Sequence, residues 1–299
     1  MVQANSECFR SINCGELSAP RVEIHQAWWA MIGLGSQGKE WSQEEKFDRI
    51  SEAGFTGVLG TSAELMDGSR WIELADRHKL LWGIGLGPWD GEKIFSYMRQ
   101  AKEAGASYVN IQPGDAFMIG REAVHFLQRI MEESLRIGLP CFFETHRGRI
   151  TQDLLRTVEY VTDMPAMRLT IDFSHYVLAG EIQQTESKAE RYFDALLRCC
   201  SAMHLRISNG QQIQIELGQD YQTNPFVQRF IQWWRKGVEY WQANARPGDI
   251  LPLVCELGPP DYSITQTSGN ETVELCDRWQ QALLLKEIVE TQILTKIPN

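Results

Sequence analysis

The segment CFFETHRG, from Cys141 to Gly148, joins an apolar run to a short series of polar and charged residues. A near-continuous apolar run is typical of a buried strand in a parallel sheet. Because side chains alternate along a strand, Glu144 and His146 share one face while Thr145 takes the other. The segment therefore predicts a buried strand that carries a carboxylate and an imidazole at its C-terminal end.

Three later segments end in the same way. The apolar runs Leu169 to Asp172, Ala202 to His204 and Leu253 to Glu256 finish in Asp, His and Glu. With Glu144 they place side chains able to bind a metal at the ends of four successive predicted strands. We therefore predict a metal site formed by Glu144, Asp172, His204 and Glu256.

The chain alternates predicted strands and helices eight times. Predicted strands cover residues 22–25 (running on towards 27), 57–60, 81–86, 108–111, 141–144, 168–172, 203–207 and 253–256. Predicted helices follow at 42–53, which opens with the capping box SQEE, and at 71–78, 94–104, 123–135, 154–161, 188–199, 226–241 and 273–290. Thr151 is the expected cap of the helix at 154–161.

Eight such units in one domain, residues 1–299, predict an α/β fold of the (β/α)8 TIM-barrel type, with residues 1–20 as an irregular N-terminal segment. A doubly wound open sheet would not usually place polar residues at the ends of strands five to eight in turn. Asn209-Gly210 lies between short alternating runs, so we also predict a small β-hairpin insertion after strand seven.

Composition limits the classes of function. The net charge of −10 argues against a polyanionic partner such as nucleic acid. Seven cysteines without a CxxC pair indicate reduced thiols. Residues 1–20 lack the apolar core of a signal peptide, and no apolar run reaches the ~20 residues that a membrane span needs. We therefore expect a cytoplasmic protein that does not bind a membrane.

The chemistry follows from the predicted ligands. Three carboxylates and one imidazole form an oxygen-rich site, for which Mn²⁺ is the expected ion and Mg²⁺, Co²⁺ or Zn²⁺ are alternatives. Two octahedral positions remain for adjacent oxygens of a sugar, so the ion can stabilise an enediolate as a C–H proton leaves. Glu144 and Glu256 each keep a second oxygen that could take or return that proton.

The order of these residues resembles the xylose isomerase-like TIM-barrel superfamily, which contains sugar phosphate isomerases and epimerases, over essentially the whole chain. The matching positions are Glu144, Asp172 with His175, His204 with Arg206, and Glu256. The resemblance implies a metal-dependent isomerase or epimerase of a keto sugar, with Glu144 and Glu256 as the acid/base pair. It further implies that His175 and Arg206 contact substrate oxygens and that the protein is a homo-oligomer.

His146 keeps a second function open. On the same face as Glu144, it is either a further catalytic base or a partner that orients Glu144. An extra base also suits a lyase or dehydratase, such as the subunit of C-glycoside-cleaving lyases that act on 3-keto sugars. A non-catalytic subunit is a remote alternative. A protein that no longer catalyses a reaction would more often have lost one of the four metal ligands, and all four are present.

Further residues are candidates for the wall of a sugar site. His25 ends the first predicted strand and is a candidate substrate contact. Trp28, Trp29 and Trp89 follow predicted strands and either face a sugar or pack in the core.

DNA-repair endonucleases of the same superfamily need histidines after the early strands and just past the strand-seven ligand. None of the six histidines lies in 81–90 or 108–115, and none follows His204. We therefore expect a small-molecule sugar as partner and no nucleic acid.

Overall fold

Eight parallel strands close into a barrel in the computed structural model, which describes residues 9–36, 38–89, 91–183, 188–218, 220–268 and 271–296. The barrel strands are β2 (Arg21–Ala27), β5 (Gly57–Thr61), β6 (Leu81–Leu86), β7 (Tyr108–Ile111), β8 (Cys141–Glu144), β9 (Leu169–Ile171), β10 (Cys200–Leu205) and β11 (Asp249–Cys255). Each pairs with the next, and β11 also pairs with β2, which closes the barrel. The predicted (β/α)8 TIM barrel is confirmed.

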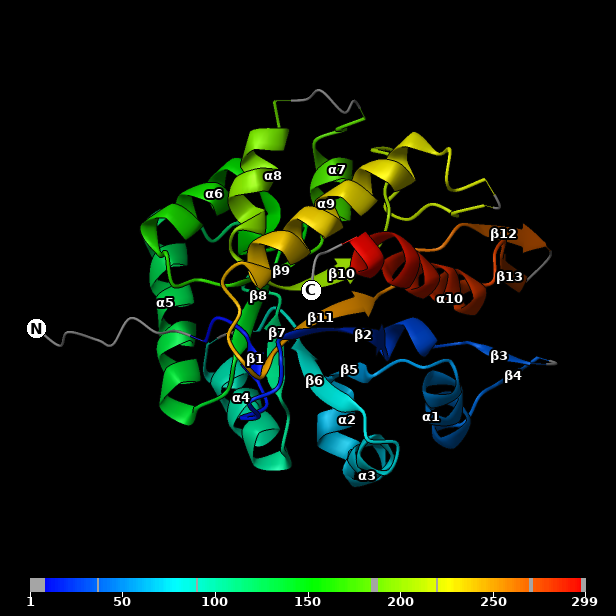
Figure 1. Cartoon of the computed structure of the whole chain (residues 1–299), viewed down its shortest axis with the longest axis horizontal. Coiled ribbons are helices and arrows are strands. Elements are labelled where there is room, and N and C mark those ends of the chain that lie inside the picture. Colours follow the sequence, from blue (N-terminus) through cyan, green and yellow to red (C-terminus); the bar gives the residue numbers. More distant parts are fainter. Residues whose placement is uncertain are drawn as a thin grey trace, which may run out of the picture.

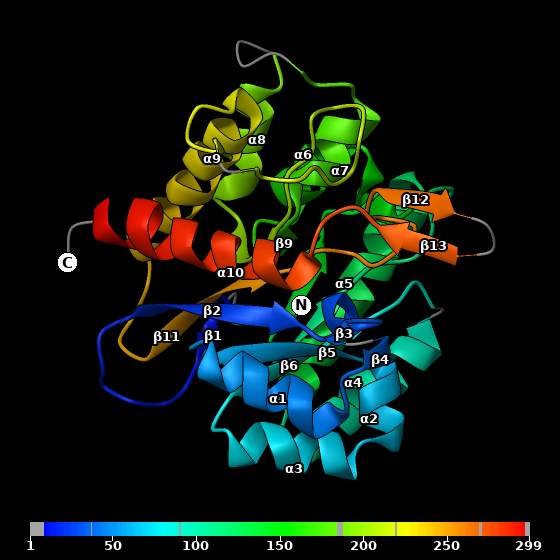
Figure 2. The same ribbon diagram turned by 90° about the vertical axis from the view of Figure 1, so that its right-hand side faces the viewer.

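Helices surround the strands on the outside of the barrel (Figures 1 and 2). They are α1 (Gln43–Glu52), α3 (Ser69–Arg77), α4 (Gly91–Ala104), α5 (Gly120–Ile137), α6 (Leu154–Asp163), α8 (Glu190–Leu197), α9 (Pro225–Gln242) and α10 (Arg278–Ile288). Two short helices that we did not predict, α2 (Ser62–Asp67) and α7 (Phe173–Ala179), directly follow β5 and the end of β9. In the described part of the chain, no helix is long and apolar enough to cross a membrane.

The N-terminal segment contributes to the barrel base. Residues 1–8 lie outside the described residues, but Ile12–Asn13 form the short strand β1. This strand pairs antiparallel with the start of β11, with Ile12 opposite Ile250. Both side chains are buried in the cluster inside the barrel. Part of the segment predicted to be irregular is therefore a strand that covers the lower end of the barrel.

The hairpin predicted after strand seven is found after strand eight instead. There β12 (Thr265–Ser268) pairs antiparallel with β13 (Glu271–Glu274). At Asn209-Gly210 the chain makes a turn, because the Asn209 side-chain oxygen accepts hydrogen bonds from the backbone N–H groups of Gln211 and Gln212. One backbone hydrogen bond, from Ile215 to Ile207, joins the two arms, and no strand forms there.

The last helix begins later than predicted, because the hairpin occupies the start of the predicted range. Residues 271–274 are in β13, and α10 begins only at Arg278, after Asp277 caps it through its side-chain oxygen. A second small hairpin, β3 (Gly35–Ser36) with β4 (Lys39–Glu40), follows β2. The arrowheads of β2, β10 and β11 point to the side of the molecule on which both hairpins lie (Figure 1). The C-terminal end of the barrel therefore carries the irregular segments, as in other barrels of this type.

Glycines make room for rings inside the barrel. A Cβ atom at Gly57 would lie 2.3 Å from His25 Nε2, and one at Gly83 would lie 2.3 Å from the Tyr108 ring. The rings of His25 and Tyr108 are fully buried and fill the lower half of the barrel. The next inward positions, two residues further along the strands, are thus left for the polar residues of the upper end.

Candidate metal centre

Four ligand-type side chains meet at the C-terminal end of the barrel. Glu144 ends β8, Asp172 follows β9, His204 lies near the end of β10, and Glu256 follows β11. One possible ligand atom from each lies within 4.8 Å of those of the other three. All four side chains are buried, with Glu256 the most accessible at 8% exposure. The structure therefore brings together the four residues that the sequence predicted as metal ligands.

Asp172 is fixed by its place between a strand and a helix. Its Oδ1 caps α7 by accepting hydrogen bonds from the backbone N–H and the hydroxyl of Ser174. Its backbone is tied to the neighbouring strand, because Asp172 N donates to Thr145 Oγ1 at 2.8 Å and Thr145 Oγ1 donates to Asp172 O at 3.0 Å. The capping leaves Oδ2 free of hydrogen bonds and only 3.4 Å from Arg206 Nη1.

Glu144 is held by two residues that the sequence analysis missed. Asn110 Nδ2 donates to Glu144 Oε2 at 2.7 Å, and Gln112 Nε2 lies 3.3 Å from the same oxygen. Both come from the end of β7, in the run YVNIQ, where Tyr108, Asn110 and Gln112 share one face. A polar residue at alternate positions of an otherwise apolar strand was the signal that could have identified them.

The backbone of Glu144 is tied down as well. Thr151 Oγ1 donates to Glu144 O and accepts from His146 N. Thr151 therefore fixes the start of the loop after β8. Our prediction that it caps the following helix is wrong. That cap is Asp153, whose side chain accepts from Arg156 N.

Arg206 links two of the carboxylates. Its Nη2 donates to Glu256 Oε2, its Nε donates to the Glu256 backbone oxygen at 2.9 Å, and its Nη1 lies 3.4 Å from Asp172 Oδ2. The guanidinium is almost completely buried, so its N–H groups interact with the carboxylates and not with bulk solvent. His204 Nδ1 lies 2.9 Å from Glu256 Oε2, but the direction of this contact does not make it a hydrogen bond.

Several ligand atoms have no hydrogen-bond partner among the described residues. These atoms are Asp172 Oδ2 and both ring nitrogens of His204. Buried polar atoms are nearly always satisfied, so unsatisfied ones that face each other call for an ion or water between them. A set of three carboxylates and one imidazole fits a hard divalent ion such as Mn²⁺ or Mg²⁺. The residues present therefore fit a metal.

The charges perturb each other strongly. Burial raises the pKa of Glu144 to about 7. Burial by itself lowers the pKa of His204, but the facing carboxylates of Glu256 and Glu144 outweigh it and raise that pKa to about 9. For Glu256, burial is outweighed by His204 and Arg206, which lower its pKa to about 2. Without a metal, the site thus keeps its imidazole protonated to balance the carboxylates.

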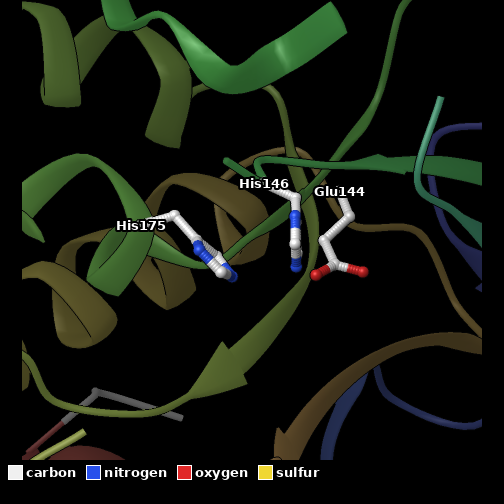
Figure 3. A group of neighbouring side chains, drawn as sticks. All are labelled: Glu144, His146 and His175. Atoms are coloured by element: carbon white, nitrogen blue, oxygen red, sulfur yellow. The ribbon is translucent and has the colours of Figure 1, made fainter. Parts of the chain in front are cut away.

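His146 and His175 lie side by side next to Glu144. Figure 3 shows His146 beside Glu144 at the end of β8, with His175 approaching from α7. The centroids of the two rings are 3.9 Å apart. His146 has no hydrogen bond to Glu144, so it does not orient that carboxylate. Burial lowers the pKa of His146 to about 3, so its ring is neutral, and Nδ1 donates to Arg147 O. Its Nε2 is left as an acceptor, 3.4 Å from the Tyr262 hydroxyl.

A cavity of about 300 Å³ lies against these groups. Its wall includes Glu144, His146, Arg149, Arg206, Glu256, Gln112, Trp29 and Tyr262. Tyr262 lies in the loop after β11, over the guanidinium of Arg206 and edge-on to Trp29. Arg149 and Tyr262 were not predicted, because both belong to irregular loops in which no period marks a face.

Four residues predicted as substrate contacts or wall residues do not line this cavity. His25 is one layer below the cavity, because β2 continues to Ala27, and its Nε2 lies 3.1 Å from Glu23 Oε2. His175 is fully buried behind His146, between the guanidinium groups of Arg147 and Arg206. Trp28 packs in the core, so Trp29 is the residue of that pair that reaches the cavity.

Trp89 does not line this cavity either, and its ring packs against Tyr97. Of the three tryptophans predicted as wall or core residues, Trp29 therefore borders the cavity.

No protein-family model matches the chain, and no curated protein matches its sequence. Solved structures do match it. D-allulose 3-epimerase from Methylomonas sp., in complex with D-allulose, has a TM-score of 0.54 at 14% identity, with 80% of this chain and 85% of that chain covered. The probable 3-DHS dehydratase AsbF from Bacillus anthracis has a TM-score of 0.56 at 14% identity, with 90% and 99% covered.

A protein described as a xylose isomerase-like TIM barrel from Mycobacterium smegmatis, in complex with magnesium, has a TM-score of 0.55 at 11% identity. It covers 92% of this chain, and 96% of its own length is matched. This chain has the TIM-barrel fold of these proteins. At these identities the likeness establishes the fold, and the chemistry must be argued from the site itself.

Proposed function

We propose that the chain is a divalent-metal-dependent sugar isomerase or epimerase that moves a proton on a carbon beside a keto group. The observation that carries this proposal is the convergence of Glu144, Asp172, His204 and Glu256 below a small cavity, with ligand atoms left unsatisfied. Fold relatives that bind D-allulose and magnesium support the same reading. Mn²⁺ is our first choice of ion, and Mg²⁺, Co²⁺ and Zn²⁺ are alternatives.

The four side chains would hold one divalent ion. Bound there, the ion would hold adjacent oxygens of the sugar and stabilise the negative charge that develops as the proton leaves. Asp172 and His204 are buried and do not line the cavity, so we assign them only the binding of the ion. Arg206 holds Glu256 in place and borders the cavity, where it can also donate to a substrate oxygen.

Glu144 and Glu256 are the groups that move the proton in this proposal. Both line the cavity, and they come from β8 and β11, which are not neighbours in the barrel. Glu256 uses Oε2 for Arg206, which leaves Oε1 without a hydrogen-bond partner among the described residues. Two carboxylates at different parts of one wall can take a proton from one face of a carbon and return it to the other.

A dehydratase or lyase of a keto sugar or 3-keto-glycoside is the second candidate, and His146 favours it. Its neutral ring lines the cavity, and because Nδ1 donates a hydrogen bond to Arg147 O, the lone pair is on Nε2, which lies 3.4 Å from the Tyr262 hydroxyl. Such a base beside Glu144 could remove a proton or assist a leaving hydroxyl group. The fold relative AsbF is itself described as a probable dehydratase.

Metal content and hydrogen exchange test the main proposal. Purified protein should contain about one divalent ion per chain by elemental analysis, and His204→Ala should lose it. Keto sugars incubated with the loaded protein in D₂O should gain deuterium at the carbon next to the carbonyl. Three zinc ions per chain, or full occupancy in His204→Ala, would contradict the ligand assignment.

Two glutamine variants test the proton-transfer step separately. Glu144→Gln and Glu256→Gln retain an oxygen that can bind the ion, but an amide cannot accept a proton at neutral pH. Removing a general acid or base typically costs ~10²- to 10⁴-fold in rate. We therefore expect turnover to collapse at matched metal occupancy. If both variants turn over normally, the metal site stands, but neither glutamate is the base.

A further inference from the structure

Arg149 places a positive charge at the cavity wall, near Glu144 and Asp115 but in an ion pair with neither. It lies in the loop after β8, is about half buried and lines the cavity beside Gln112 and His146. Its Nε donates to Gln112 Oε1 at 3.1 Å and its Nη1 donates to Gly148 O at 2.9 Å. Within the described residues it has no carboxylate oxygen within 4.0 Å.

The neighbouring arginines are committed elsewhere. Arg206 is paired with Asp172 and Glu256. Arg147 donates to His175 Nδ1 at 3.1 Å and lies over the Tyr262 ring, and it does not border the cavity. Of the two arginines that line the cavity, Arg149 is therefore the one that forms no ion pair among the described residues.

The three carboxylates of the metal site have other partners than Arg149. Glu144, Asp172 and Glu256 supply three negative charges, which the two charges of a divalent ion and the one of Arg206 match. His204, as a metal ligand, would be neutral. Arg149 lines the cavity without an ion pair, so its guanidinium is available to an anionic group on the ligand.

Gln112 sets the position of that charge relative to the metal ligands. Its amide nitrogen approaches both oxygens of Glu144, at 3.3 and 3.4 Å, while its amide oxygen accepts from Arg149. One side chain therefore connects the cation to a metal ligand. Because Glu144 and Arg149 line the same cavity, one molecule could contact the metal site at one end and Arg149 at the other.

We infer that Arg149 is a specificity-determining residue that binds a carboxylate of the substrate, so that the substrate is a keto sugar acid. The inference rests on the proposed function. One guanidinium matches the single charge and the planar, two-oxygen shape of a carboxylate. A phosphate monoester carries about 1.5 to 2 charges at pH 7, and it would leave the site with excess negative charge. The cavity of about 300 Å³ is at the small end for ligand sites, which suits a monosaccharide.

Matched ligands that differ only at carbon 6 test this. Protein loaded with Mn²⁺ would be titrated calorimetrically with D-fructose, D-fructuronate and D-fructose 6-phosphate. The same comparison with D-tagatose, D-tagaturonate and D-tagatose 6-phosphate covers a second configuration. In at least one series the carboxylate should bind roughly 10- to 100-fold more tightly than the neutral sugar, as expected of a charge-assisted hydrogen-bonded pair.

Arg149→Gln should remove that preference, and Arg149→Lys should retain part of it, because lysine keeps the charge without the two-pronged geometry. Arg121→Gln, at an exposed position of α5, is the matched control and should bind like the unaltered protein. Circular dichroism and metal content would verify that each variant is folded and loaded.

The outcomes separate this inference from the proposed function. Equal binding of neutral and anionic sugars in both series, or a preference that survives in Arg149→Gln, would overturn it. A preference for the phosphate would overturn the assignment of a carboxylate. If the carboxylate binds through Arg149 but no sugar exchanges hydrogen in D₂O, the inference about binding stands and the isomerase proposal fails.

Discussion

Asn110 orients Glu144 through a single buried hydrogen bond, and this bond decides how the carboxylate faces the metal site. Asn110 Nδ2 donates a hydrogen bond to Glu144 Oε2 at 2.7 Å. The other carboxylate oxygen, Oε1, then faces His204, whose Nδ1 is 3.7 Å away. Groups that orient metal ligands in this way typically contribute 10- to 100-fold to metal affinity or activity. The residue that positions a ligand can therefore matter nearly as much as the ligand.

Asn110→Ala should accordingly weaken metal binding by roughly 10- to 100-fold, because Glu144 loses its strongest hydrogen bond and can rotate. Competition with a chromophoric chelator would measure the dissociation constant. Asn244→Ala, at an exposed asparagine of the opposite barrel end, is the control and should leave it unchanged. Unchanged affinity in Asn110→Ala would show that Glu144 keeps its orientation without Asn110.

His146→Ala distinguishes the two candidate functions. If the protein is an epimerase or isomerase, the ring only shapes the cavity wall beside Glu144, and we expect turnover to slow by roughly 10- to 100-fold. Rates would be compared at equal metal occupancy, with the exposed His125→Ala as control. A loss beyond ~10⁴-fold with metal retained would identify His146 as the essential acid or base and favour the dehydratase or lyase.

At the scale of single elements, β6 shows how strands are matched to the inside of the barrel. Its sequence LWGIGL puts Gly83 and Gly85 on the inward face. The ring of Tyr108 fills the space over Gly83, whereas above Gly85 the cavity begins. The same residue type thus serves packing at one level and an open site at the next.

Gly83→Ala should destabilise the fold, because its Cβ atom would lie 2.3 Å from the buried Tyr108 ring. Overpacking of this kind costs about 1–3 kcal/mol in the free energy of unfolding. Gly85→Ala is the matched control on the same strand and face, since the nearest atom to its Cβ would be 3.4 Å away. Denaturant unfolding should show a loss for the first variant and little change for the second, and equal stabilities would argue against the tight packing at Tyr108.

At the scale of the whole molecule, metal uptake should be linked to protons. In the metal-free site the pKa of His204 is raised to about 9 and that of Glu144 to about 7, so at neutral pH His204 is almost always protonated and Glu144 about half of the time. Both must be deprotonated to bind an ion. Because protons compete with the metal, the affinity should rise as the pH increases from 6 to 9.

Calorimetry in two buffers of different ionisation enthalpy tests this linkage. At pH 7 we expect the release of about one proton per metal ion or more, since His204 is the group with the pKa well above 7. The bound ion should also raise the melting temperature, by an amount that grows with the logarithm of its free concentration above the dissociation constant. Heats that do not depend on the buffer would mean that His204 is already neutral before the metal binds.

Much of this architecture could be predicted from the sequence. Periods of two and 3.6 identified the alternation of strands and helices, and the change from apolar to ligand-type residues located Glu144, Asp172, His204 and Glu256. These features are local, because a strand that is buried on both faces must be apolar until it reaches the barrel mouth. The cellular compartment and the homo-oligomer stay predictions.

Other features depended on contacts between distant residues. Asn209-Gly210 resembled a hairpin turn, but the two arms around it share one backbone hydrogen bond and do not form paired strands. His25 was expected at the cavity, but Ala27, the next inward position of β2, lines it and His25 lies one layer down. Strand ends are set by pairing with neighbours, so a shift of two residues moves a side chain from the cavity into the core.

The sequence by itself determined the barrel and its four ligand-type residues, because those follow from the order and period of residues along single strands. Only the tertiary structure decided what surrounds them. Asn110 reaches Glu144 across 34 positions, and Arg206 reaches Glu256 across 50. Arg149 and Tyr262 meet at one cavity from the loops after β8 and β11. Such contacts arise only when the barrel closes, since closure brings the loops of distant strands to one end.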